Sequence, residues 1–267
     1  MVRARGISIL LLTLFSISVI AQSTQQRPEL ETAPIATYDE ATSRTKSTAG
    51  FKNLQTIGLA FHGYHDIFGR FPPAVLFGPD GKTPYSWRVE LLPVLNHYAN
   101  QIDPQTDIST RQATDAAIAA CGYDTLQTCD SPQNQKVLQS IPDAYRHPSD
   151  KNDSIDAGFF AISGSGTVFD PATISKYTDI KGWPGSTLMV AEYRAREPWT
   201  KPVDIAYSSD ATVPRFSGFS RHGFLTLSAD GAVHFVSDTV LPNDLRAFIS
   251  TDQSDSIQIP GIPYQFE

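Results

Sequence analysis

The sequence predicts an α+β fold in which one long N-terminal helix packs on an antiparallel β-sheet, with extra loops and short helices. Three observations carry this prediction. Apolar residues recur at helical spacing before residue 68, β-type segments appear only after residue 155, and residues 221–238 have the pattern of a hairpin. Helices first and antiparallel strands later is the order typical of α+β domains.

The first 21 residues, "MVRARGISILLLTLFSISVIA", have the pattern of a cleaved export signal. Arg3 and Arg5 precede an uncharged apolar run, and Val19 and Ala21 have the spacing that signal peptidase accepts. We therefore expect an exported protein, periplasmic or extracellular. The alternative is a retained anchor, although the apolar run is about five residues shorter than the roughly 20 that a membrane-spanning helix needs.

Residues 22–37 are polar, aperiodic and rich in proline, which predicts a disordered linker before a single domain over 38–267. The 40% hydrophobic content is ordinary for a globular protein. The net charge of −7 becomes more negative once the signal segment and its arginines are removed. Nucleic acid is therefore not an expected partner, and no stable membrane span is expected after cleavage.

The first predicted helix covers about residues 40–67, and "GRFPP" from Gly69 to Pro73 ends it. Its apolar side consists of residues at helical spacing: Leu54, Ile57, Gly58, Phe61 and His65. A second helix is predicted over 86–98, with a bend at Pro93. In the polar stretch 101–140, "TDAAIAA" is the only segment that we expect to be helical.

Strands are predicted at 156–163 and 186–194, and a hairpin closes the domain. Asp230 and Gly231 form the dipeptide typical of a two-residue type I′ turn, in which paired residue numbers would sum to 461. In that register His222 and His234 point to opposite faces of the ladder. The two histidines are therefore not expected to share a metal ion, and Asp230 is expected to have a conformational role.

Two cysteines, Cys121 and Cys129, lie close together in "CGYDTLQTC". In an exported chain this arrangement favours a disulfide over a metal or redox pair. We therefore predict a local bridge between them, while the hydrophobic core carries the fold.

The standard catalytic motifs are missing from the sequence: no nucleophile elbow, zinc-protease helix, Walker loop or dinucleotide-binding loop is present. Residues 150–161 resemble the start of a calcium loop, but Ile155 and Ala161 occupy its glycine and bidentate glutamate positions. His62 and His65 lie on one side of the first helix without a third ligand. We therefore expect no enzyme activity, metal or cofactor.

The block "EYRAREPWTKPVD" is the most promising polar segment for ligand binding. Glu192 follows an apolar strand, while Trp199 and Lys201 lie in a proline-rich stretch, and Arg88 could join them. An aromatic ring beside charges can hold a sugar or a peptide. The alternative is structural: Trp199 covers an edge of the core, and Glu192 pairs with an arginine such as Arg88 or Arg194.

Five ordered blocks carry a family resemblance over about residues 50–250: "FKNLQTIGLAFHGYHDIFGRFPPA", "SWRVELLPVL", "YRHPSD", "LMVAEYRAREPWTKPVDI" and "LSADGAVHFVSD". Together they resemble the planctomycete-type pilin-like family of unknown function, which is grouped with prepilins and type II secretion pseudopilins. The resemblance implies a long helix laid against an antiparallel sheet. Unlike a standard prepilin, this chain has Ile7 after Gly6 and Leu11 where the mature pilin helix carries glutamate.

Two functions of different classes follow from these observations. The first is an exported, non-catalytic pilin-like structural or interaction protein of the cell envelope, with envelope or secretion-system proteins as partners. The alternative is a periplasmic binding module for a small solute or glycan. A pocket lined by Arg88, Glu192 and Trp199 would favour the binding module, whereas an exposed apolar patch or sheet edge would favour protein interaction.

Overall fold

The computed structural model describes residues 49–98, 110–151, 153–173, 175–216 and 223–252, all within one compact unit, Thr37–Glu267. The predicted signal segment, the predicted linker, the start of the first predicted helix and His222 lie outside the described residues. None of the described helices combines the length and the apolar character needed to cross a membrane.

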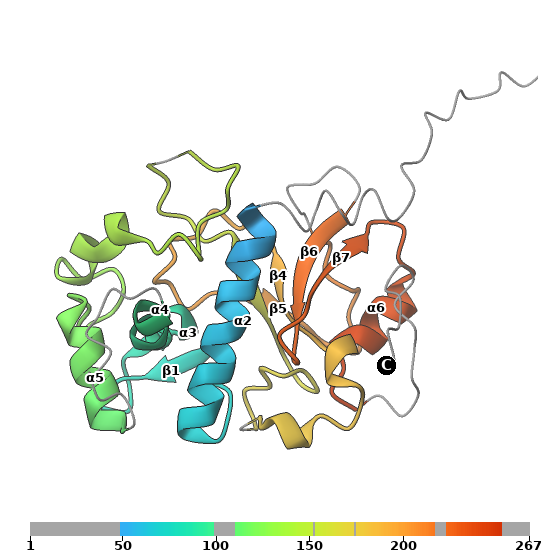
Figure 1. Cartoon of the computed structure of the whole chain (residues 1–267), viewed down its shortest axis with the longest axis horizontal. Coiled ribbons are helices and arrows are strands. Elements are labelled where there is room, and N and C mark those ends of the chain that lie inside the picture. The colour runs from blue at the N-terminus through green and yellow to red at the C-terminus, as the bar shows by residue number, and fades with distance from the viewer. Residues whose placement is uncertain (1–48, 99–109, 152, 174, 217–222, 253–267) are drawn as a thin grey trace, which may run out of the picture. The chain divides into compact units, whose positions relative to one another are not determined.

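The architecture is mixed α+β, as predicted (Figure 1). Its helices are α2 (Ala49–Phe68), α3 (Trp87–Glu90), α4 (Leu92–Tyr98), α5 (Arg111–Ala120) and α6 (Pro242–Ile249). The described residues also form the 3-10 turns η1 (Asn134–Ser140), η2 (Tyr177–Asp179) and η3 (Pro184–Ser186). The strands are β1 (Val75–Phe77), β2 (Pro84–Ser86), β3 (Phe159–Ser163), β4 (Leu188–Glu192), β5 (Ile205–Ala206), β6 (Gly223–Ser228) and β7 (Val233–Ser237).

Five strands form the main sheet in the order β5-β3-β4-β6-β7, while β1 and β2 form a separate ribbon. All pairs in the main sheet are antiparallel except β3 with the two-residue β5. The sheet is therefore mixed at one edge and not purely antiparallel, because the chain returns along β3 after the proline-rich stretch that precedes Ile205.

Helix α2 lies between the main sheet and helix α4: it contacts β6 and β7 on one side and α4 on the other (Figure 1). Its buried residues include Leu54, Ile57 and Phe61, which confirms the predicted apolar side. Gly58 permits the close approach to the hairpin, because a Cβ there would lie 2.9 Å from Leu227 Cδ1. The helix ends at Gly69, whose φ of 67° lies in the left-handed region that glycine tolerates.

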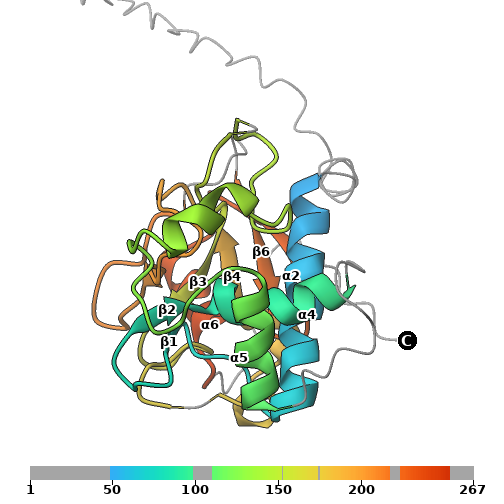
Figure 2. The same cartoon turned by 90° about the vertical axis from the view of Figure 1, so that its left-hand side faces the viewer.

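The second predicted helix is two short helices that meet at Leu91, so the bend comes slightly before Pro93. Ser86 caps α3, because its side chain accepts a hydrogen bond from Arg88 N at 3.2 Å. Pro93 is the second residue of α4, where a missing backbone N–H costs nothing. Figure 2 views the molecule from the side on which α4 and α5 lie.

The closing hairpin forms, but the predicted turn and register are wrong by one residue. Leu227 pairs with Val233, so paired numbers sum to 460. Gly231 N donates to Ser228 O at 2.9 Å, and Ser228 N donates to Ala232 O at 2.9 Å, which leaves a three-residue loop. Gly231 has φ 87°, whereas among the described non-glycine residues only Arg196 has positive φ. This is a type I turn closed by glycine, not a type I′ turn.

Asp230 explains why the longer loop is stable. Its Oδ1 accepts hydrogen bonds from Ser228 Oγ at 2.7 Å and from Ala232 N at 2.9 Å. Such a side-chain cap stabilises a turn without requiring positive φ at the aspartate. Asp230 therefore stabilises the turn through its side chain.

Candidate functional site

The residues predicted to bind a ligand do not gather around one pocket. Arg88 is buried in the core and pairs with Asp204, with Arg88 Nη2 3.0 Å from Asp204 Oδ1. The Arg88 guanidinium also lies over the rings of Trp87 and Phe160, at 4.5 and 4.6 Å from the ring centroids. These contacts satisfy a charge that burial would otherwise make costly, so Arg88 has a structural role.

Glu192 is buried at the end of β4 and pairs with His147, not with Arg88. His147 Nε2 lies 2.9 Å from Glu192 Oε1, and Leu225 N donates to Glu192 Oε2 at 2.9 Å. Ser149 N donates to His147 Nδ1 at 3.0 Å, so Nε2 carries the ring hydrogen and donates to the carboxylate. The hydrogen bond between His147 and Glu192 could not be predicted from local spacing, because the two residues lie 45 positions apart in the sequence.

Trp199 and Lys201 make structural contacts within the protein. Trp199 is buried, and its Nε1 donates to Leu138 O at 3.1 Å, while its ring stacks on Tyr145. Lys201 Nζ pairs with Glu197 Oε2 at 2.8 Å, four residues earlier in the chain. Of the four predicted residues, Trp199 is the one that lines the cleft described next.

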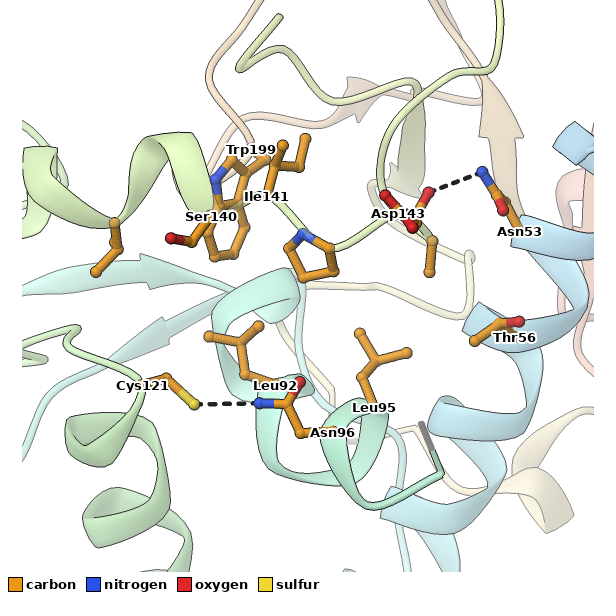
Figure 3. Close-up of a pocket in the computed structure, with 13 residues that line it drawn as sticks. Asn53, Thr56, Leu92, Leu95, Asn96, Cys121, Ser140, Ile141, Asp143 and Trp199 are labelled. Atoms are coloured by element: carbon orange, nitrogen blue, oxygen red, sulfur yellow. Dashed lines mark hydrogen bonds between the residues drawn. The ribbon is translucent and has the colours of Figure 1, made fainter. Parts of the chain in front are cut away.

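One cavity is an open cleft of about 540 Å³ between α2, α4 and the segment after η1 (Figure 3). Its apolar wall includes Leu92, Leu95, Val137, Ile141, Pro142 and Trp199. Its polar lining includes Asn53, Thr56, Asn96, Cys121, Ser140 and Asp143. A volume of this size suits a small ligand, and the mixture of apolar wall and few polar groups is typical of binding sites.

Hydrogen bonds fix several of the polar side chains that line the cleft. Asn53 Nδ2 donates to the main-chain oxygens of Asp143 and Arg146, both at 2.8 Å. Asn96 Nδ2 donates to Cys121 Sγ at 3.2 Å, as Figure 3 shows. Both amides are therefore oriented before any ligand arrives. Among the described residues, the lining carries one carboxylate, Asp143, and no Lys, Arg or His, so it suits a ligand with hydroxyl or amide groups better than a strongly charged one.

The predicted bridge between Cys121 and Cys129 is not formed in the structure, where both cysteines are free. The loop between them is held by the buried Asn134, whose Nδ2 donates to the main-chain oxygens of residues 124, 127 and 128. Cys121 lines the cleft beside Asn96, whereas Cys129 lies close to Lys201 and Asp130. The two thiols thus face different neighbours, and burial raises the pKa of both.

The histidines of α2 have packing partners. His62 lies edge-on to Phe71, with ring centroids 6.0 Å apart, and His65 Nε2 accepts a hydrogen bond from Tyr177 N at 3.2 Å. Within the described ranges, no three His, Cys, Asp or Glu side chains come close enough to hold a metal ion. His97 is part of α4.

Apart from Trp199, the cleft residues were not predicted as ligand-binding from the sequence, because no motif joins them. They come from helix α2, helix α4, the end of α5 and residues 137–144, which are separated along the chain by stretches of other structure. A single asparagine on a helix, such as Asn96, is an ordinary surface residue in sequence. Only the packing of α2 against α4 brings these side chains to one cavity.

Comparison with known proteins gives one match. Residues 50–201 match the model of a family described as "Protein of unknown function (DUF1559)", whose model carries the name SBP_bac_10. No curated protein and no solved structure gives a significant match. The matched residues include α2, most of the cleft lining and both members of the His147–Glu192 pair. Because the match covers more than half of the chain, the protein belongs to this DUF1559 family.

Proposed function

We propose that the protein is an exported, non-catalytic binding protein of the cell envelope, and that the cleft between α2 and α4 takes a small solute or glycan. The observation that carries this proposal is the 540 Å³ cleft with its oriented amides, Asn53 and Asn96. An apolar wall that ends at Trp199 can pack against the non-polar face of a sugar ring, while amide and hydroxyl groups pair with its hydroxyls.

A blocking substitution at the rim of the cleft tests this proposal. Ser140 lines the cleft and is exposed, so Ser140→Trp fills the opening without disturbing the core. Gln139, its exposed neighbour, does not line the cleft, and Gln139→Trp is the matched control. We expect isothermal titration with neutral di- and trisaccharides to find a binder whose affinity falls at least about tenfold, or roughly 1.4 kcal/mol, in Ser140→Trp only. Equal affinity in both variants, or no binder in the panel, would contradict the proposal.

Export is a separate part of the proposal and has its own test. The positively charged start, apolar run and Val19-x-Ala21 spacing support cleavage before about Gln22. N-terminal sequencing of protein recovered from outside the cytoplasm should therefore begin near Gln22. Recovery of a chain with Met1 from the membrane fraction would instead support the retained anchor.

The second candidate function is a pilin-like structural or interaction role. It is favoured by the 20-residue α2, which lies against an antiparallel pair of strands, β6 and β7. The exposed side chains of Phe77 and Leu126 add apolar surface that a protein partner could cover. Chemical cross-linking in the cell envelope, followed by mass spectrometry, tests this role. Cross-links that map to α2 or to Phe77 and Leu126 would support it, and the absence of reproducible partners would count against it.

A further inference from the structure

A second cavity, of about 450 Å³, lies on a different part of the surface from the cleft. We call it the charged pocket, and its lining consists of Ser149, Asp150, Lys151, Asp153, Ser154, Asp156, Ala157, Arg194 and Arg196. It shares no lining residue with the cleft. Six of its nine residues carry ionisable side chains, three acidic and three basic, so its chemistry differs from that of the nearly neutral cleft.

One wall of the charged pocket is a three-residue excursion of the chain after β4. Tyr193 N donates to Gly158 O at 3.1 Å, and Ala157 N donates to Glu197 O at 3.0 Å. Ala157 and Gly158 are adjacent, whereas their partners Glu197 and Tyr193 lie four residues apart. Residues 194–196 therefore loop out between the two hydrogen bonds. Such bulges aim side chains away from the ladder. Here the excursion presents Arg194 and Arg196 to the pocket.

Arg196 makes this turn in the left-handed region, with φ 52°, where among the described residues no other non-glycine lies. This conformation is unfavourable for a residue with a Cβ, and glycine would adopt it more easily. The sequence nevertheless carries a long cationic side chain at this position, where its guanidinium lines the pocket. Strained residues of this kind cluster at ligand-binding sites.

The opposite wall comes from the described residues that follow His147, and hydrogen bonds hold Ser154 in place. Ser154 N donates to Lys151 O at 2.9 Å, and Arg146 Nη1 donates to Ser154 O at 2.7 Å. The buried His147–Glu192 pair then joins the two walls, because His147 precedes Ser149 by two residues and Glu192 precedes Arg194 by two. The pocket is thus built on a buried hydrogen bond between two distant chain segments.

Arg196 faces the acidic side chains of the charged pocket without forming an ion pair with them. Within the described part of the chain, no ion pair within 4.0 Å joins Arg196 to Asp150, Asp153 or Asp156. Burial and the neighbouring Asp150 carboxylate raise the pKa of Asp156, and the Arg196 guanidinium opposes this effect. Arg196 is therefore close enough to act on Asp156 electrostatically, while open volume remains between the two walls.

We infer that the charged pocket binds a zwitterion, an α-amino acid or a dipeptide. The carboxylate of such a ligand would pair with the guanidinium of Arg196, a group that favours planar carboxylates. Its ammonium group would lie toward Asp150, Asp153 and Asp156. A simple anion would be repelled by these three carboxylates, and a metal cation would be repelled by the two guanidiniums and Lys151. A ligand with both charges satisfies both walls at once.

Ligand derivatives test the requirement for both charges on the wild-type protein. The probes are a panel of free L-amino acids and dipeptides, and for each binder its N-acetyl derivative, its methyl ester and the doubly blocked form. Titration calorimetry at low salt should give at least one zwitterion that binds about tenfold or more tightly than either singly blocked form. Inorganic phosphate and calcium complete the panel. Tight binding of either ion alone, equal binding of the blocked forms, or no binding at all would overturn the inference.

Variants of Arg196 separate binding from folding. Arg196→Gly removes the guanidinium and suits the left-handed φ, so thermal stability should stay equal or rise while affinity for the zwitterion falls about tenfold or more. Asp156→Asn should weaken binding of the zwitterion and of its methyl ester, which keeps the ammonium group, more than binding of the N-acetyl derivative, so the two walls are probed separately. Arg215→Gly is the control, because Arg215 is exposed and lies outside the pocket. Unchanged affinity in Arg196→Gly would refute the site.

Discussion

The polar groups of the main sheet and those of the cleft behave in opposite ways. At the sheet, Arg88 with Asp204 and His147 with Glu192 are buried and paired, so their charges hold chain segments together. At the cleft, Asn53 and Asn96 are oriented but line an open volume. The charged residues singled out in the sequence therefore stabilise the fold, whereas asparagines that belong to no sequence motif line the cavity. Substitutions at the sheet should cost stability, and those at the cleft should change binding or reactivity.

The largest effect is expected at Asp204, which accepts three hydrogen bonds on one oxygen. Arg88 Nη2, Trp87 Nε1 and Ala161 N all donate to its Oδ1, at 3.0, 3.1 and 2.8 Å. Asp204→Ala leaves a buried guanidinium without its partner, and we expect the free energy of unfolding to fall by about 3–5 kcal/mol. Urea denaturation measures the change. The exposed Asp210→Ala is the control and should change stability by less than about 0.5 kcal/mol.

If Asp204→Ala proved as stable as the wild type, the buried Arg88–Asp204 pair would not stabilise the sheet. The expected difference between the sheet and the cleft would then be wrong. A result between these limits would measure how much of the Arg88 charge the Phe159 main-chain oxygen satisfies, since Arg88 Nη2 also donates to it at 2.8 Å.

The next largest effect is expected at the hairpin turn. Gly231→Val places a β-branched residue at φ 87°, and its Cβ would lie 3.2 Å from the His62 ring. We expect a loss of about 1–3 kcal/mol in the free energy of unfolding. Asp230→Asn keeps the oxygen that caps the turn and should be nearly neutral. Thermal melts of both variants check the pair, and a stable Gly231→Val protein would show that the positive φ is not required.

The free energy of unfolding is expected to depend on pH through His234, which lies in strand β7 of the main sheet. Burial lowers the pKa of His234, and the nearby Asp230 carboxylate opposes this effect. The folded protein therefore binds this proton less readily than the unfolded chain does. Its contribution to stability is present above the ordinary histidine pKa of about 6.5 and is lost as pH falls toward the lowered folded value. The loss has a limiting slope of about 1.4 kcal/mol per pH unit.

The histidine contribution is isolated by comparing stability against pH in the wild type and in His234→Gln. The variant should lose less stability between pH 7 and pH 5, because its amide does not titrate. Parallel curves for the two proteins would assign the acid sensitivity to other groups.

The smallest effect is expected at Cys121, which lines the cleft. Burial raises its pKa, so less thiolate is present at neutral pH and alkylation should be slower than in the unfolded chain. Stability should be unchanged in Cys121→Ser, which identifies the labelled site. Any saccharide that occupies the cleft should slow the alkylation of Cys121 further. Rapid labelling in the folded protein, or labelling indifferent to a bound saccharide, would remove Cys121 from the binding surface.

The two cysteines also sharpen the contrast between fold and cleft. The sequence favours a bridge, whereas both thiols are free in the structure. Mass spectrometry without reductant distinguishes these states by two hydrogens. A bridged protein would need Cys121 to leave Asn96, its hydrogen-bond donor at 3.2 Å, and would therefore alter the cleft.

Local patterns by themselves determined much of the fold. Apolar spacing predicted α2 and its buried Leu54, Ile57 and Phe61, since a helix must bury one continuous side. The Asp-Gly dipeptide predicted a hairpin with Gly231 in the left-handed region. Its register was missed by one residue, because Asp230 can cap a longer turn through its side chain, and sequence alternation cannot distinguish the two loops.

Tertiary structure alone decided which polar residues meet. His147 and Glu192 lie 45 residues apart, and Arg88 and Asp204 lie 116 apart, so no local spacing could predict either pair. The cleft and the charged pocket arise in the same way, from side chains that become neighbours only when helices and strands pack. The physical reason is that local backbone preference depends on near neighbours in sequence, whereas the pairing of a buried charge depends on whatever segment folds against it.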